Sequence, residues 1–96
     1  MPRRRDPISF PLGRVVATPG ALRALEDAGQ VSEDYLLRHA RGDWGSVGSE
    51  DWQANEEALK HGTRLFSVYE IAEGEKLWII TEADRSATTL LLPSEY

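Results

Sequence analysis

The chain has 96 residues, of which 41% are hydrophobic and 28% charged, and its formal net charge is −5. A chain of this length forms one domain with one small core. It contains no cysteine, which excludes a disulfide framework and a thiolate metal site. No apolar run approaches the roughly 20 residues that span a bilayer. We therefore expect a cytoplasmic protein with neither a membrane segment nor a signal peptide.

Charge is distributed unevenly along the chain. Residues 1–14 carry four arginines against one aspartate, a net of +3, whereas residues 15–96 carry seven basic and fifteen acidic side chains, a net of −8. An acidic body argues against extended binding to a phosphate backbone, which needs clustered Lys and Arg. It suits a basic protein partner or imitation of the charge of a nucleic acid. Contact with nucleic acid is expected only through Arg3, Arg4 and Arg5.

The first segments contain few regular elements. Residues 1–9 are predicted to be a flexible basic N-terminus, and residues 10–96 to be a single α+β domain. The segment from Phe10 to Ala17 has the character of an extended chain. Because it contains a proline, we expect an edge strand or a lead-in there rather than a central strand.

Three helices are predicted after this segment. Thr18 is a good N-cap and Pro19 suits the first helical position, and Gly29 is a typical end for that helix. Two further helices are predicted at Ser32 and Ser49. Each of these serines is followed by two acids, and the helix dipole favours negative charge in the first turn.

From residue 63 onward the pattern changes to strands. Three segments rich in aromatic and β-branched residues are separated by short turns; they cover residues 64–71, 77–81 and 88–92. Short connections predict an antiparallel meander. The predicted fold is therefore α+β, with two or three N-terminal helices packed on a three-stranded antiparallel β-meander. Apolar residues fall on both strand faces, so helices should cover one face, and the N-terminal segment or the second subunit of a homodimer the other.

The polar turn between the last two predicted strands is the first candidate site. It holds Glu82, Asp84 and Arg85, followed by Ser86. In a catalytic interpretation Glu82 is a base and Arg85 holds an anion. In a structural interpretation the segment is simply a turn, because Asp and Ser bond their own backbone. We favour the turn, with Glu82, Asp84 and Arg85 as residues that contact a partner.

The tetrad from Gly42 to Gly45 is the second candidate site. Asp43 and Trp44 lie between the two glycines. An exposed tryptophan there would be an anchor for a partner, because Trp dominates interface hot spots. A tryptophan in such a loop also commonly folds back onto a small core. Asp43 and Trp44 are included among the predicted partner-binding residues.

Catalysis is only weakly indicated. His39 and His61 lie near the ends of predicted helices, and an acid–base nuclease would combine one of them with Glu82 and Arg85. Nothing in their spacing supports that arrangement. Metal-binding, nucleotide-binding and hydrolase motifs are absent from the sequence. We therefore expect no cofactor, no metal and no catalytic residue, and a small nuclease-like toxin is the alternative.

Four blocks of the sequence resemble a family of small proteins carried by bacterial plasmids, integrative elements and phages. The blocks are residues 15–22, 42–45, 64–69 and 78–96, and the last is the most specific. Many members carry the label plasmid-related protein or type I restriction endonuclease subunit M. An adenine methyltransferase needs an Asn/Asp-Pro-Pro-aromatic motif and a glycine-rich loop on a large domain, and this chain has neither. The resemblance implies a mobile-DNA setting and supplies no catalytic residues.

These features together predict a small non-catalytic binding protein of a mobile genetic element. It would act by protein–protein contact, with a host protein or defence complex as its partner. Inhibition of a host defence system, CRISPR or restriction, is the sharpest form of this hypothesis. A DNA-associated accessory factor that uses Arg3, Arg4 and Arg5 is a further alternative.

Overall fold

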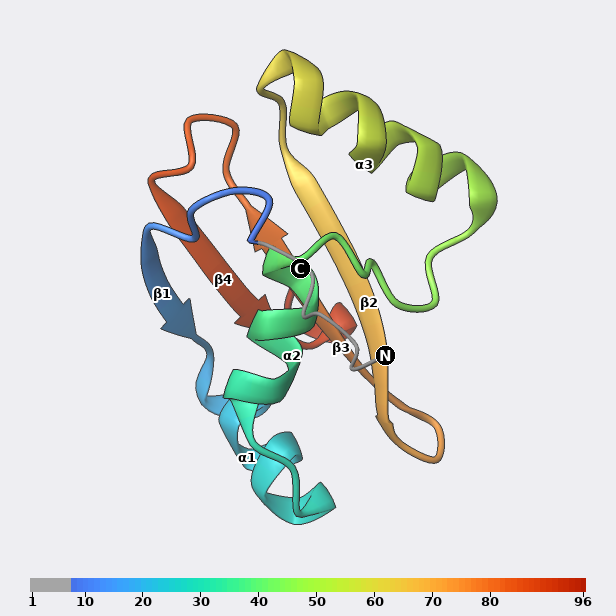
Figure 1. The fold of residues 1–96 in the computed structure, drawn as a ribbon. Helices are drawn as coiled ribbons and strands as arrows, with labels where there is room; N and C mark the ends of the chain where they lie inside the picture. Colours follow the sequence, from blue (N-terminus) through green and yellow to red (C-terminus); the bar gives the residue numbers. More distant parts are fainter. Residues whose placement is uncertain (1–7) are drawn as a thin grey trace, which may run out of the picture.

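A computed structural model describes residues 8–96 of the chain. The predicted contacts of Arg3, Arg4 and Arg5, and most of the predicted flexible N-terminus, lie outside the described residues. The elements follow in the order β1 (Arg14–Ala17), α1 (Pro19–Ala28), α2 (Ser32–Ala40), α3 (Ser49–His61), β2 (Leu65–Ala72), β3 (Glu75–Thr81), β4 (Ala87–Leu91) and the 3₁₀ helix η1 (Pro93–Glu95) (Figure 1). Across residues 8–96, no helix has the length and apolar composition that crossing a bilayer requires.

The four strands form one mixed sheet in the order β1-β4-β3-β2. The predicted meander is present in β2, β3 and β4, which pair antiparallel. β1 extends it by pairing parallel with β4, from Arg14 opposite Ala87 to Ala17 opposite Leu90. The α+β class is therefore confirmed, and the edge strand expected within residues 10–17 is present as β1. The prediction of a three-stranded, purely antiparallel sheet is wrong, because β1 adds a fourth strand in parallel. The local sequence of β1 does not indicate which distant strand it pairs with.

The helix starts follow the capping signals of the sequence. The hydroxyl of Thr18 accepts a hydrogen bond from the N–H of Ala21 at 3.0 Å, and Gly29 ends α1 with φ 69°. α2 and α3 begin at Ser32 and Ser49 as predicted, but both serines are the first helical residues rather than side-chain caps. Acids in their first turns favour these helices through the dipole.

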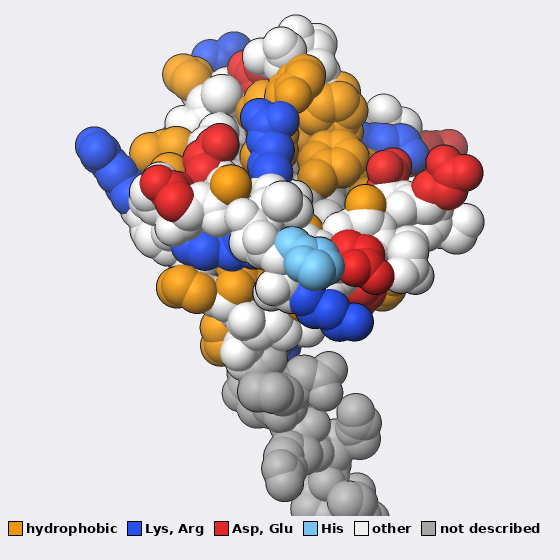
Figure 2. Space-filling model, turned by 90° about the horizontal axis from the view of Figure 1, so that it is seen from above, with side chains coloured by type: hydrophobic (Ala, Val, Ile, Leu, Met, Phe, Trp, Pro, Cys, Tyr) orange, Lys and Arg blue, Asp and Glu red, His pale blue; other side chains and the backbone are white. Residues whose placement is uncertain are grey.

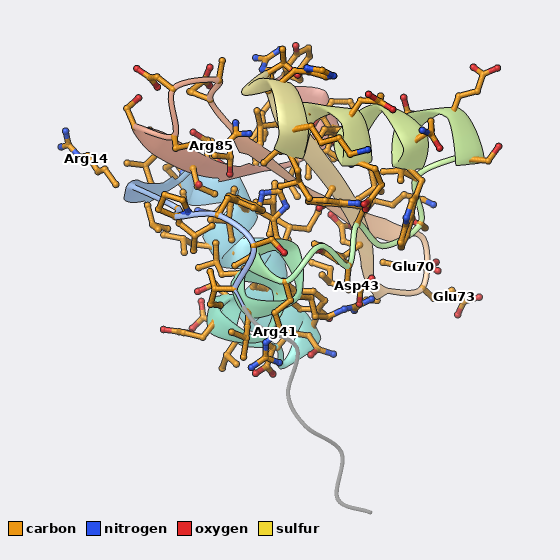
Figure 3. The ribbon with its side chains drawn as sticks, turned by 45° about the horizontal axis from the view of Figure 1, so that its top comes forward. Arg14, Arg41, Asp43, Glu70, Glu73 and Arg85 are labelled. Atoms are coloured by element: carbon orange, nitrogen blue, oxygen red, sulfur yellow. The ribbon has the colours of Figure 1, made fainter. Side chains whose placement is uncertain are left out.

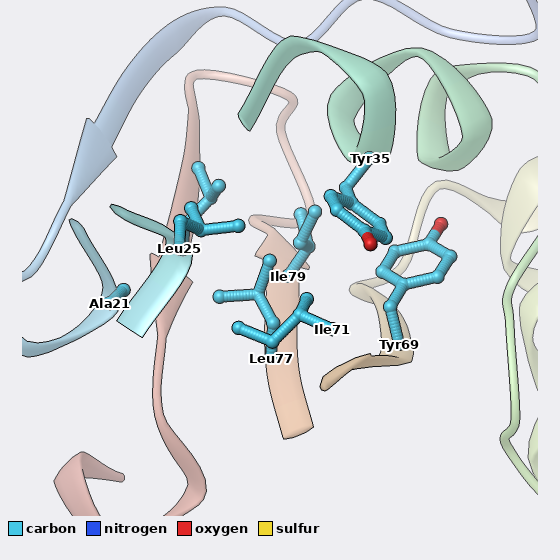
Figure 4. Close-up of a cluster of buried hydrophobic side chains, with 8 residues drawn as sticks. Ala21, Leu25, Tyr35, Tyr69, Ile71, Leu77 and Ile79 are labelled. Carbon is cyan, nitrogen blue, oxygen red and sulfur yellow. The ribbon is translucent and has the colours of Figure 1, made fainter. Parts of the chain in front are cut away.

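The main core lies between α1, α2 and one face of the sheet (Figure 4). Ala21 and Leu25 of α1 pack there against buried residues of the strands. The ring of Tyr35 from α2 lies 5.3 Å from that of Tyr69 on β2. Such tilted aromatic pairs add to the free energy gained by burying apolar area. The core therefore fixes both helices on one face of the sheet.

A second, smaller core joins the N-terminal segment to α3. Phe10, Trp44, Ala58 and Leu65 form it. The side chain of Leu65 lies on the face of β2 that also carries the buried Tyr69. The prediction that the N-terminal segment covers the second face of the sheet is therefore wrong for the part from Phe10 onward, which packs on the same side as the helices.

The outer edge of β2 is covered by side chain and loop. The amide of Asn55 on α3 donates to the carbonyl of Phe66 at 2.7 Å and accepts from the N–H of Phe66 at 3.1 Å. The N–H of Val68 donates to the carbonyl of Trp44 at 3.1 Å, and the N–H of Ser46 donates to the carbonyl of Val68 at 2.7 Å. These four bonds take the place of a neighbouring strand, and the two made by Asn55 hold α3 beside the sheet (Figure 1).

Candidate functional site

The segment after β3 forms the tight turn that its residue types predicted. A carboxylate oxygen of Asp84 accepts a hydrogen bond from the N–H of Ser86 at 3.0 Å, and the N–H of Arg85 donates to the carbonyl of Glu82 at 2.9 Å. Arg85 takes the left-handed conformation, with φ 62°. That conformation is uncommon for a non-glycine residue, so the side chain of Arg85 must contribute enough to hold it.

The guanidinium of Arg85 joins the turn to the end of α3. It donates to the carbonyl of Thr63 at 2.6 Å and to that of Ala58 at 3.1 Å, with further bonds to carbonyls of its own turn. Its Cζ lies 5.6 Å from the centre of the Phe10 ring. A cation at a helix C-terminus is favoured by the dipole. Arg85 therefore has a structural role, and the interpretation of this group as an anion holder is not supported.

Glu82 and Asp84 remain at the surface of this turn. Both side chains are exposed. Within residues 8–96, neither forms an ion pair with His39, His61 or Arg85. Hydrogen bonds from Ser86 hold the pKa of Asp84 below its usual range, so this carboxylate is charged at neutral pH. Glu82 and Asp84 thus keep the accessibility that a contact residue needs.

Trp44 is a core residue rather than an exposed anchor. Its relative exposure is 0%, its ring stacks 6.1 Å from that of Phe10, and its indole N–H donates to Glu56 at 2.9 Å. A buried side chain cannot contact a partner, so the prediction of Trp44 as a surface binding residue is wrong. The indole instead packs in the smaller core with Phe10, Ala58 and Leu65.

Asp43 is partly exposed but committed to local bonds. It forms an ion pair with Arg38 at 2.8 Å, which raises the pKa of that arginine, and it accepts from the N–H of Gly45 at 3.2 Å. Its carbonyl accepts the hydroxyl proton of Tyr69. Figure 3 shows Asp43 well separated from Arg85. The structure therefore places the two predicted contact regions apart, and they do not form one site.

A buried polar chain crosses the core at His39. The Nδ1 atom of His39 lies 2.6 Å from the hydroxyl of Ser67, and its Nε2 atom lies 2.9 Å from the hydroxyl of Thr81. The chain continues from Thr81 to Thr88 at 2.7 Å, and Thr88 donates to the carbonyl of Leu12 at 2.7 Å. All four side chains are fully buried.

The donor and acceptor in each of these hydrogen bonds follow from the bond between Thr88 and the carbonyl of Leu12. A carbonyl only accepts, so Thr88 must donate its single proton to Leu12 and accept from Thr81. Thr81 then has no proton left for His39, and must accept from Nε2–H. Neutral His39 consequently carries its proton on Nε2 and accepts the Ser67 proton on Nδ1. The ring is fully satisfied without charge.

This arrangement does not support acid–base catalysis by His39. Burial and, to a smaller extent, the nearby charge of Arg85 lower the pKa of His39 to about 3, so the ring is neutral at physiological pH. Ser67 and His39 have the contact of a nucleophile and its base, but a substrate would have to reach a pair that is fully buried. His61 is exposed and lies 3.3 Å from Glu57, outside this chain of contacts.

The sequence did carry a signal for the buried chain. Ser67 stands between Leu65 and Tyr69 in a strand whose alternate side chains face the core. Polar side chains that face the core need hydrogen-bond partners inside the protein. For Ser67 this partner is His39. The pairing itself has no local signal, because Ser67 and Thr81 lie 28 and 42 positions from His39 in the sequence.

Two further observations concern metal-binding residues and similarity to known proteins. Among the described residues, no group of three or more His, Asp or Glu side chains could hold a metal ion. Comparisons with protein-family models, with curated proteins and with solved structures give no match.

Removing the Arg85 side chain is expected to destabilise the fold moderately. Arg85→Ala should lower the free energy of unfolding by about 1.5 kcal/mol, since charge-assisted hydrogen bonds contribute about that much when partly exposed. Urea unfolding at pH 7.5 measures it. Arg23→Ala, on the exposed face of α1, is the matched control and should change the value by less than about 0.5 kcal/mol. Equal values for both variants would contradict the structural role of Arg85.

Proposed function

We propose that the protein is a non-catalytic binding protein that acts by protein–protein contact through an acidic surface on α3 and the β3–β4 turn. The observation that carries this proposal is the exposure of α3. Of its thirteen residues, Asn55 and Ala58 are buried, and the helix packs along the outer edge of β2 instead of on a sheet face (Figure 1). Most of its surface is therefore free to meet another molecule.

The free surface of α3 is strongly acidic and continues onto the neighbouring turn. Arg85 joins that turn to the end of α3 through Ala58 and Thr63. The exposed carboxylates of the helix and the turn are Glu50, Asp51, Glu56, Glu57, Glu82 and Asp84. Trp52, 38% exposed in the first turn of α3, adds an aromatic group of the kind that anchors interfaces. Complementary charge accelerates association and selects partners.

A basic protein surface is the partner that fits this chemistry. In the mobile-element setting implied by the sequence resemblance, such a surface belongs to a host protein or defence complex that binds nucleic acid. Inhibition of a CRISPR or restriction system by occupying that surface is the most specific form of the proposal. The nuclease-like alternative would use His39 or His61 with Glu82 and Arg85. His39 is buried with both ring nitrogens bonded, and His61 lies beside Glu57, so neither supports this alternative.

Charge reversal tests this proposal. The full chain is expressed against a panel of CRISPR and restriction systems, with phage or plasmid survival as the measurement. We expect Glu82→Lys with Asp84→Lys to reduce inhibition and capture of the inhibited complex at least tenfold. The matched control is Glu26→Lys with Asp27→Lys, which reverses two exposed acids of α1. Failure to inhibit any system, or equal loss in both double variants, would contradict the proposal.

A further inference from the structure

The face of the sheet opposite α1 and α2 carries a shallow cavity with aromatic walls. It measures about 350 Å³ and, among the described residues, is lined by Arg64, Phe66, Trp78, Ile80 and Tyr96. Phe66 lies opposite Ile80 in the β2–β3 register, so strand pairing fixes two of these side chains next to each other. A cavity of this size is at the lower end of the range of small-molecule sites.

The walls of this cavity are held by their own contacts. The ring of Trp78 stands edge-on to that of Phe66 at 5.0 Å and to that of Tyr96 at 5.4 Å. Ile80 is 5% exposed and forms an apolar floor. Figure 2 shows hydrophobic side chains gathered on the side of the molecule away from the grey N-terminal residues, with Lys or Arg side chains beside them. A flat ring can pack against such walls without rearranging them.

The polar groups of the lining are hydrogen-bond donors. Arg64 and the Trp78 indole can only donate. The hydroxyl of Tyr96 accepts from Nη1 of Arg64 at 3.2 Å, which leaves its own proton to donate. Among the lining residues, Arg64 is the one with a cationic side chain, and none has an acidic side chain. The ion pairs found within residues 8–96 join Arg38 to Asp43 and His61 to Glu57. Arg64 therefore has no ion-pair partner among the described residues.

We propose that this cavity binds a small planar aromatic carboxylate. The ring packs against Trp78 and Phe66, and the carboxylate accepts hydrogen bonds from Arg64, whose planar fork matches the two oxygens. An aromatic amine would leave the donors unmatched, and a neutral ring would leave the guanidinium without a counter-charge. The site uses none of the residues on the α3 surface. A test of ligand binding here is therefore independent of the proposed protein–protein contact.

Titration of the full chain with 2-naphthoate tests this site. The ¹H–¹⁵N spectrum resolves the indole N–H signals of the three tryptophans, and the binding curve is read from Trp78. We expect a saturable shift of the Trp78 signal, while the signal of buried Trp44, bonded to Glu56, stays in place. The neutral analogue 2-naphthalenemethanol should bind at least fivefold more weakly.

Arg64→Gln provides the decisive variant. It should remove the preference for naphthoate over the neutral alcohol and leave binding of the alcohol within twofold of the wild type. Arg23→Gln, which removes an exposed cation on α1, should change neither affinity. The inference is overturned if the Trp78 signal does not saturate, if the acid and the alcohol bind equally, or if Arg64→Gln leaves the preference intact.

Discussion

Replacing Gly45 with alanine is expected to lower the free energy of unfolding by about 3 kcal/mol, a large part of the stability of a small domain. Gly45 has φ 80°, where a Cβ costs about 1 kcal/mol. The added Cβ would also collide with the carbonyl oxygen of Val68 and lie 2.8 Å from the ring of Tyr69. Relief of this collision requires breaking the bonds from Trp44 and Ser46 to β2, which adds about 1 kcal/mol for each. Chemical denaturation at pH 7.5 measures the loss.

Two other glycines separate the steric cost at Gly45 from the backbone cost. Gly62 has φ 71°, but a Cβ there would meet no atom within 4 Å. Gly62→Ala should therefore cost about 1 kcal/mol, the backbone cost alone. Gly48 has an ordinary φ of −69° and open space, so Gly48→Ala should change stability by less than about 1 kcal/mol. A loss at Gly45 no larger than the loss at Gly62 would show that loop 44–46 is not tightly paired with β2.

Acid is expected to destabilise the protein through His39. The unfolded histidine takes up a proton below its ordinary pKa of 6.5, whereas the folded one stays neutral until about pH 3. The unfolded state therefore binds more protons between these values, and the free energy of unfolding falls as the pH falls. From pH 7.5 to pH 5.0 this amounts to about 2 kcal/mol. Urea unfolding at the two pH values measures it.

The contribution of His39 is isolated by comparing variants. His39→Gln keeps a donor and an acceptor but does not titrate, so its stability should fall by about 2 kcal/mol less than that of the wild type over the same range. The exposed His61→Gln is the matched control and should follow the wild type. The lowered pKa values of Asp84 and Glu95 matter only as the pH falls through and below about 4. Parallel pH profiles for His39→Gln and the wild type would contradict the buried neutral ring.

Local sequence signals predicted the elements but not their assembly. Capping and first-turn acids located all three helices, and residue composition located β2, β3 and β4 to within two residues of the observed bounds. Pairing of β1 with β4 has no local signal, because every pair in its register, such as Arg14 opposite Ala87, joins residues far apart in the sequence. The hydrophobic pattern specifies faces, whereas neighbours in a sheet are selected by the whole fold.

The sequence also predicted the surroundings of the candidate contact residues only in part. Polarity suggested that Arg85 and Asp43 face outward, and the loop between two glycines suggested the same for Trp44, yet each is engaged within the fold. Arg85 bonds the end of α3, Trp44 fills the smaller core, and Asp43 pairs with Arg38. Glu82 and Asp84, which have no such bond to a distant element, are the two predicted residues that stay exposed. The structural roles of Arg85 and Trp44 depend on contacts with distant elements, which the local sequence does not predict.

The covered edge of β2 has a consequence for aggregation. A strand with free N–H and C=O groups is a template for further strands, and Asn55 with loop 44–46 blocks much of that template on one side of the sheet. The other side ends at β1, where Val15 and Val16 are 43% and 40% exposed. Growth of the sheet by a foreign strand, in aggregation or in assembly, is therefore directed to the β1 edge.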